Sequence, residues 1–199
     1  MGVYRTKTAW QRWMQRWVAY AIRHRVRPNI FTAGGLVFAF LAAAALASAP
    51  SNHQVLWLVP VGLLSRLLFN LMDGQVARGL GMADKWGEVK NEFGDRVADA
   101  AIFLALSAYA DLRLIALALT LVLLASYLGI LSKALGYKRI YSGIFGKGDR
   151  MLSLALYVPI PLFTGDLASF NWYLAFACLA SVITIYQRLR ILRGYAQST

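Results

Sequence analysis

The chain has 199 residues, of which 59% are hydrophobic and 15% charged, and its formal net charge is +12. This composition is too apolar for an ordinary soluble domain. Residues 28–65, 114–132 and 167–187 contain no Lys, Arg, Asp or Glu, and each stretch can cross a bilayer. The sequence therefore predicts an all-α integral membrane protein. Its basic residues lie beside the apolar stretches, which favours anionic lipids and phosphate-bearing substrates over nucleic acid as partners.

Residues 1–27 are basic and lack the continuous apolar run of a cleavable secretory signal. From Trp10 onward, apolar side chains recur at helical spacing and arginines take the other side. The apolar set is Trp10, Trp13, Met14, Trp17, Val18, Ala21 and Ile22. We expect an amphipathic helix in the membrane interface, with its tryptophans at headgroup depth. Packing of this helix against another part of the protein is the alternative.

Residues 28–199 are expected to form one membrane domain of six transmembrane helices. Pro28 suits the first position of a helix. The expected helices cover about residues 28–48, 55–78, 87–110, 112–135, 151–163 and 168–189. The fifth helix is short and contains Pro159 and Pro161.

The basic residues predict the orientation of these helices. With six helices both termini lie on one side, and that side carries eighteen Lys or Arg, whereas the opposite connections carry only Arg113. By the positive-inside rule, both termini and the connection between helices two and three face the cytoplasm, and the protein lies in the inner cell membrane.

Residues 70–99 place acids and carboxamides at helical spacing in this apolar chain. Asn70 and Asp73 share one face of the second helix. One face of the third helix carries Glu88, Asn91, Glu92, Asp95 and Asp99. Oxygen ligands without Cys or a His pair suit Mg²⁺, Mn²⁺ or Ca²⁺ and not zinc. The pattern predicts a divalent-cation site; ion pairs with Arg66, Arg78 and Arg96 are the alternative.

Four other residues, two of them glycines and two of them basic, each allow two interpretations. Gly74 and Gly87 allow a close approach of backbone or ligand, or serve helix packing. Lys147 and Arg150 offer fixed positive charges to phosphate oxygens, or only set the topology.

The stretch resembles the signature of the CDP-alcohol phosphotransferase (CDP-alcohol phosphatidyltransferase) family, Asp-x2-Asp-Gly-x2-Ala-Arg-x8-Gly-x3-Asp-x3-Asp. Six of its eight positions match without a change of spacing, and they are Asp73, Gly74, Ala77, Arg78, Gly87 and Asp95. The remaining two are Asn70 and Asn91. Pro28-Asn29-x2-Thr32 and Gly146-Lys147-x2-Arg150 also look like family segments.

The resemblance implies an enzyme that joins an alcohol to a lipid by displacing CMP from a CDP-activated partner, with one or two Mg²⁺ or Mn²⁺ ions. It implies metal binding by Asn70, Asp73, Asn91 and Asp95, with Asp95 also the catalytic base. Lys147 and Arg150 would bind phosphate of the acceptor. The nucleotide and diphosphate would contact Asn29, Thr32, Arg66, Gly74, Ala77, Arg78 and Gly87. A homodimer is a further expectation from the family.

Asn70 and Asn91 remove two negative charges from this set. Metal binding is then weaker, or one ion is absent, unless another carboxylate compensates. The candidates on the adjacent helical positions are Glu88, Glu92 and Asp99. A catalytically degenerate CDP-lipid-binding homologue is therefore an alternative.

The leading expectation is transfer of a phosphatidyl group from CDP-diacylglycerol to a small polar alcohol, phosphorylated or not, with release of CMP. A CDP-alcohol donor with diacylglycerol as acceptor is a close variant. An ion channel or transporter would also explain carboxylates within a membrane. It would not explain the Asp-Gly-x2-Ala-Arg pattern with Gly87 at its set distance.

Overall fold

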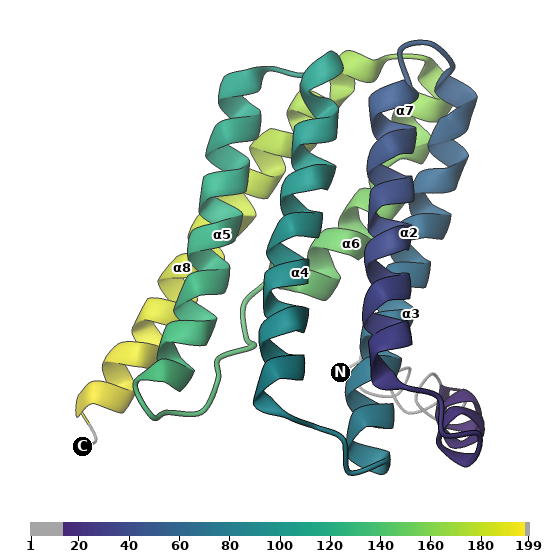
Figure 1. Cartoon of the computed structure of the whole chain (residues 1–199). Coiled ribbons are helices and arrows are strands. Elements are labelled where there is room, and N and C mark those ends of the chain that lie inside the picture. Colours follow the sequence, from purple (N-terminus) through teal and green to yellow (C-terminus); the bar gives the residue numbers. More distant parts are fainter. Residues whose placement is uncertain (1–13, 198–199) are drawn as a thin grey trace.

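The computed structural model describes residues 14–197, and within them every regular element is helical. The long helices are α2 (Pro28–Ser48), α3 (Leu58–Gly79), α4 (Lys85–Ala105), α5 (Leu112–Ala134) and α8 (Phe170–Gln197). Two shorter helices are α6 (Lys147–Tyr157) and α7 (Pro159–Thr164), and the 3₁₀ turns are His53–Trp57, Leu106–Ala108 and Leu167–Ser169. The long helices run side by side as a bundle (Figure 1).

Four helical segments of the described chain are long and apolar enough to cross a membrane, and they cover α2, α3 with its preceding turn, α5 and α8 with its preceding turn. The expected third helix corresponds to α4, which starts two residues earlier than expected and gives way to a 3₁₀ turn after Ala105. α8 extends to Gln197, beyond the expected end at 189.

The fifth expected helix, residues 151–163, is divided in the structure. α6 begins at Lys147, and the helix breaks at Val158 before α7. Pro159 and Pro161 have no backbone N–H to donate to the preceding turn, which explains the break.

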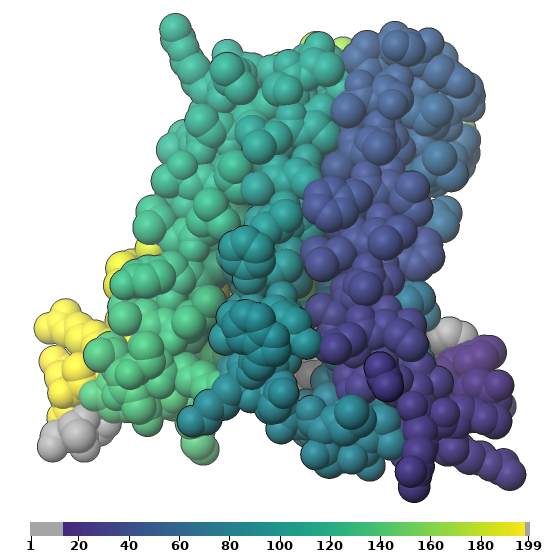
Figure 2. Space-filling model, viewed as in Figure 1, coloured from purple at the N-terminus to yellow at the C-terminus, as the bar shows by residue number. Residues whose placement is uncertain are grey.

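The bundle core forms where α2 packs on α3 and α4. Ala39, Ala42 and Ala43 of α2 are buried together with Leu63 of α3 and Ala98 of α4. Small side chains let these helices approach closely. Figure 2 shows the outer face of this assembly, where side chains of α2 and α4 meet along the upper half of the view. The packing fixes α3 and α4, which carry the acidic residues, against the start of α2.

Residues 14–23 form a helix, as expected, and this helix lies at the same end of the bundle as the end of α8 (Figure 1). Met14, Val18 and Ala21 are buried in a small core with residues of α2 and α3, whereas Trp17 is 53% exposed. The apolar face is thus largely packed on the protein. The interfacial position stays a prediction, and Trp10 and Trp13 lie outside the described residues.

The connection 135–146 re-enters the bundle. It runs from the lower end of α5 back up between α5 and α4 before α6 begins (Figure 1). Arg188 of α8 holds it, because Nε donates to the Ser142 carbonyl at 2.9 Å and Nη1 donates to the Ala125 carbonyl of α5. At Gly143, where φ is +134°, a Cβ would lie 2.5 Å from Thr184 Cγ2. The re-entry brings Lys147 and the buried Arg150 into the bundle.

Candidate active site

A cleft of about 460 Å³ opens between the start of α2, the end of α3 and the first half of α4. It is lined by nearly all the residues that the family signature predicts. These are Asn29, Thr32, Asn70, Asp73, Gly74, Ala77, Arg78, Gly87 and Asn91. We call it the first cleft. Of the residues predicted to bind the nucleotide or the metal, Arg66 and Asp95 do not line it. Arg66 is 1% exposed, and both line a small cavity together with Asn70 and Asn91.

The two carboxylates of the expected metal set have different surroundings. Asp73 lines the first cleft and accepts a hydrogen bond from Thr32 Oγ1 at 2.8 Å. Asp95 is 5% exposed, and its Oδ1 contacts the ammonium of Lys147 and lies 3.5 Å from Arg66 Nη2. Asn70 and Asn91 line both the first cleft and the small cavity, and so connect the two carboxylates.

This set fits an oxygen-binding divalent cation. Within residues 14–197 no cluster of three or more His, Cys, Asp or Glu is placed to hold a metal, so an ion at this set would need oxygen ligands from the carboxamides. The Asn70 side-chain nitrogen is buried without a hydrogen-bond partner, which leaves this amide free to turn its oxygen toward an ion. Two carboxylates and two amide oxygens suit Mg²⁺ or Mn²⁺.

The three candidate compensating carboxylates are all engaged in ion pairs. Glu88 pairs with Lys133 of α5. Glu92 pairs with Arg139 and, at 3.1 Å, with Arg96. Asp99 faces Arg66, Arg96 and Arg150. Compensation for Asn70 or Asn91 would require breaking one of these pairs. The alternative of interhelical ion pairs is therefore partly realised, with Arg66 and Arg96; Arg78 lines the first cleft instead.

A second pocket of about 210 Å³ adjoins the first cleft and shares Asn91, Glu92, Arg139 and Tyr141 with it. Five cations line it, against the two acids Glu92 and Asp95. The cations are Arg96, Arg139, Lys147, Arg150 and Arg188. Buried guanidinium nitrogens of three of them have no hydrogen-bond partner among the described residues, namely those of Arg96, Arg139 and Arg150. The second pocket is therefore suited to a small anion.

Charges from the 135–146 connection and α8 were not recognised as site residues from the sequence. In the sequence, Arg139 and Arg188 contribute only to the number of basic residues that predicts the topology. Burial tends to lower the pKa of the Arg139 guanidinium, but its hydrogen bond and ion pair with Glu92 outweigh this and raise the pKa, so Arg139 stays charged. The sequence offers one signal for Arg188, because it is the first charged residue after the uncharged stretch 167–187 and so lies at the end of an apolar segment.

Lys90 is another site residue that the sequence did not indicate. Its ammonium donates to Asn29 Oδ1 at 2.6 Å and joins the start of α2 to α4 across the first cleft. The predicted cleft residue Asn29 is therefore held in place by a lysine.

Gly87 has a structural reason for its place in the signature. Asp84 caps the N-terminus of α4, where its Oδ1 accepts from the Gly87 N–H at 2.5 Å. A Cβ at Gly87 would lie 2.8 Å from that oxygen. Glycine thus lets α4 start where its acidic face meets α3.

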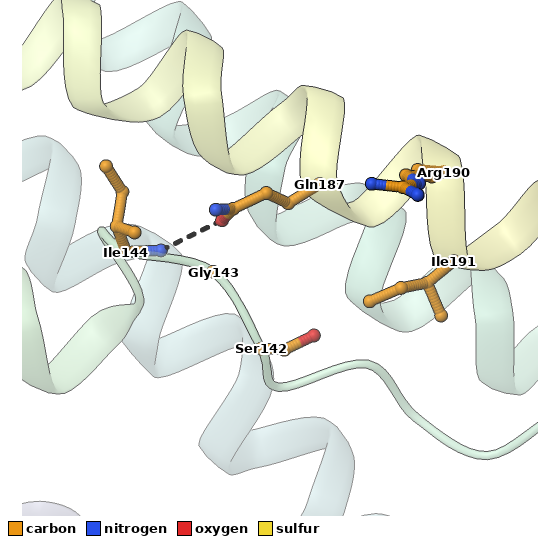
Figure 3. Close-up of a pocket in the computed structure, with 6 residues that line it drawn as sticks. All are labelled: Ser142, Gly143, Ile144, Gln187, Arg190 and Ile191. Carbon is orange, nitrogen blue, oxygen red and sulfur yellow. Dashed lines mark hydrogen bonds between the residues drawn. The ribbon is translucent and has the colours of Figure 1, made fainter. Parts of the chain in front are cut away.

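A further surface groove shares none of its lining residues with the first cleft or the second pocket. It is formed by Ser142, Gly143, Ile144, Gln187, Arg190 and Ile191 (Figure 3). The Gln187 side chain points toward the connection and accepts from the Ile144 N–H at 3.2 Å. None of the predicted site residues lines this groove.

Comparisons with known proteins agree with this geometry. Residues 25–187 match the family described as CDP-alcohol phosphatidyltransferase. The chain is 29% identical to inner membrane protein YnbA of Escherichia coli over 159 residues, which is 79% of each chain. It is 26% identical to phosphatidylinositol phosphate synthase of Cutibacterium acnes, over 96% of this chain and 98% of that protein.

Two solved structures share the fold. Both are of the phosphatidylinositol phosphate synthase PgsA1 of Mycobacterium tuberculosis, at 21% identity. The structure with CDP-DAG bound superposes with a TM-score of 0.69, over 91% of this chain and 94% of that one. The complex with manganese and citrate gives 0.70, over 90% and 88%. Because the family match covers most of the residues, the chain belongs to the CDP-alcohol phosphatidyltransferase family of membrane enzymes.

Proposed function

We propose that the protein transfers a phosphatidyl group from CDP-diacylglycerol to a small phosphorylated alcohol and releases CMP. The observation that carries this proposal is the junction of two pockets beside Asp95. The first cleft is lined by the signature residues other than Asp95, and the adjoining second pocket is lined by Asp95 and five cations. The CDP-DAG bound to PgsA1 and the relative named phosphatidylinositol phosphate synthase support the choice of donor and of a phosphorylated acceptor.

In this proposal the first cleft binds the nucleotide of the donor. Arg78 and Lys90 supply positive charge at its wall, and Asn29 and Thr32 supply polar contacts from the start of α2. A divalent cation, when held by Asn70, Asp73, Asn91 and Asp95, would supply charge neutralisation for the diphosphate and the departing CMP. The proposal covers either Mg²⁺ or Mn²⁺, bound as one ion or as two.

Asp95 is the proposed general base. Its carboxylate lines the second pocket and is within reach of an acceptor there. It takes the proton of the acceptor hydroxyl as the oxygen forms a bond to the phosphorus of the phosphatidyl group, and the bond from that phosphorus to the CMP oxygen breaks. Lys147 and Arg66 balance the charge of Asp95 before the proton arrives.

The second pocket gives a prediction on acceptor choice. The purified protein with CDP-diacylglycerol and Mg²⁺ or Mn²⁺ should release CMP with glycerol 3-phosphate or inositol phosphate faster than with glycerol or inositol. Arg96→Gln removes a cation from the second pocket and should raise KM for the phosphorylated acceptor about tenfold, since a hydrogen bond to a charged group contributes about 1.5–3 kcal/mol. The KM for CDP-diacylglycerol should stay within about twofold.

Arg113→Gln is the matched control, because Arg113 is exposed at the opposite end of the bundle, at the start of α5. Equal use of phosphorylated and plain alcohols would overturn the choice of acceptor. Absence of CMP with every acceptor would favour the degenerate CDP-lipid-binding protein.

The two asparagines give a prediction on metal binding. Asn70→Asp with Asn91→Asp should tighten Mn²⁺ binding by about tenfold or more in calorimetry, since ligand charge sets the affinity of such sites. Asn52→Asp is a suitable control, because Asn52 caps a 3₁₀ turn far from the first cleft and Asp is an equally good cap. Unchanged Mn²⁺ affinity in the double variant would remove both positions from the ligand set.

The protein is an integral membrane protein, and we place its active site on the cytoplasmic side. The helix 14–23, the first cleft and the end of α8 lie toward one end of the bundle, where the basic residues gather. A homodimer stays a prediction from the family.

A further inference from the structure

Asp99 is a buried carboxylate that lies one helical turn beyond Asp95 on α4. It is 4% exposed. Arg150 Nη2 of α6 donates to its Oδ2 at 2.6 Å. Arg66 of α3 approaches its other oxygen at 3.6 Å, and Arg96 lies 3.8 Å from Oδ2. Asp99 is therefore the common partner of three arginines from three helices.

Two of these arginines connect Asp99 with the second pocket. Asp99 itself lines neither the first cleft nor the second pocket, whereas Arg96 and Arg150 line the second pocket. Arg150 is fixed at two points, because Nη1 donates to the Phe145 carbonyl at 3.2 Å and Nη2 to Asp99, and its buried Nε has no partner. The guanidinium thus keeps further N–H groups, the Nε–H among them, that it can donate from a fixed position.

We propose that Asp99 is a positioning residue for the acceptor: it holds the guanidinium of Arg150, and with it Arg96, at the wall of the second pocket where the acceptor phosphate binds. This inference rests on the proposed function for the identity of the ligand. Without Asp99, Arg150 would keep its charge but lose the contact that fixes one side of its planar group. The phosphate would then meet a mobile cation, which binds less well because ordering it costs conformational entropy.

A merely structural ion pair would behave differently from a positioning residue. Loss of a structural pair lowers the unfolding temperature and affects both substrates alike. Loss of a positioning contact weakens the phosphorylated acceptor selectively. It also makes the effects of Asp99 and Arg150 non-additive, since the two act through one contact.

The test measures binding of glycerol 3-phosphate and inositol phosphate by calorimetry, together with KM for each substrate and the unfolding temperature. Asp99→Asn should weaken the phosphorylated alcohol about tenfold, the size typical of losing an outer partner of a binding group, and leave the KM for CDP-diacylglycerol within about twofold. Arg150→Gln should weaken it at least as much, and the double variant no more than Arg150→Gln alone.

Two further variants complete the design. Asp111→Asn, at the N-cap of α5, is the control for the same substitution at a remote site. Asp99→Glu keeps the charge and moves the carboxylate by one methylene, so it should show the same selective loss if Asp99→Asn does not fold. Three results would overturn the inference. Asp99→Asn could bind the phosphorylated alcohols as tightly as the wild type, or the losses of binding in the two single variants could multiply in the double variant. The third such result is that neither phosphorylated alcohol binds to the wild type.

The outcome for the proposed function is separate. If the wild type binds a phosphorylated alcohol in an Asp99-dependent way but releases no CMP, the proposed function fails and the positioning role stands. If CMP is released and Asp99→Asn binds the acceptor normally, the positioning role fails and the function stands.

Discussion

Asp95→Asn is expected to lower the rate of CMP release by about 10³-fold, within the range of about 10²–10⁴ that a positioned general base contributes. Asparagine keeps the size of the side chain and one oxygen but cannot accept the proton of the acceptor hydroxyl. Initial rates of CMP formation at saturating CDP-diacylglycerol measure the effect. We expect kcat to fall, because Asp95 accepts the proton of the acceptor hydroxyl only in the transition state.

Binding measurements separate this loss from misfolding. Asp95→Asn removes the carboxylate partner of Lys147 and one of the two carboxylates that Arg66 faces. Asp95 does not line the first cleft, so at a metal concentration that saturates the variant CDP-diacylglycerol should still bind. Asp111→Asn should release CMP at the wild-type rate. A rate for Asp95→Asn within about threefold of the wild type would exclude Asp95 as the base.

The fold followed from the sequence where apolar stretches and their ends carried the signal. Pro28 marks the start of α2, and the uncharged stretches coincide with α2, α5 and α8. The 135–146 connection could not be predicted, because a basic, glycine-rich segment has the composition of a surface loop. Its re-entry depends on contacts with Arg188 and Thr184, which are far away in the sequence.

The candidate site, like the fold, could be predicted from the sequence only in part. The signature residues other than Asp95 line the first cleft, because their spacings on α3 and α4 set the helix faces that meet. The sequence does not identify Arg139 and Arg188 as site residues, because a count of loop charges predicts the topology and not the position of each side chain. The partners of Glu88, Glu92 and Asp99 also needed the structure, since a helical face shows which acids lie together but not which cations reach them.

Arg66→Met is expected to destabilise the protein by about 3–5 kcal/mol, the cost of breaking a buried ion pair by removing one partner. Arg66 is 1% exposed, and it was expected from the family to contact the nucleotide. In the structure Arg66 Nη2 lies 3.5 Å from Asp95 Oδ1, and Arg66 Nη1 lies 3.6 Å from Asp99 Oδ1. Methionine fills a similar volume without charge, so the two carboxylates lose a cation they share.

Denaturant unfolding in detergent measures this loss, with Arg113→Met as the exposed control, for which a change below about 0.5 kcal/mol is expected. Adding Asp99→Asn to Arg66→Met should recover part of the stability, because it removes a carboxylate that has lost one of its cations, and the double variant should be less destabilised than the sum of the single ones. Additive losses would mean that Arg66 does not stabilise the fold through Asp99. A loss below about 1 kcal/mol for Arg66→Met, combined with a raised KM for CDP-diacylglycerol, would instead return Arg66 to the nucleotide-binding role that the family resemblance implies.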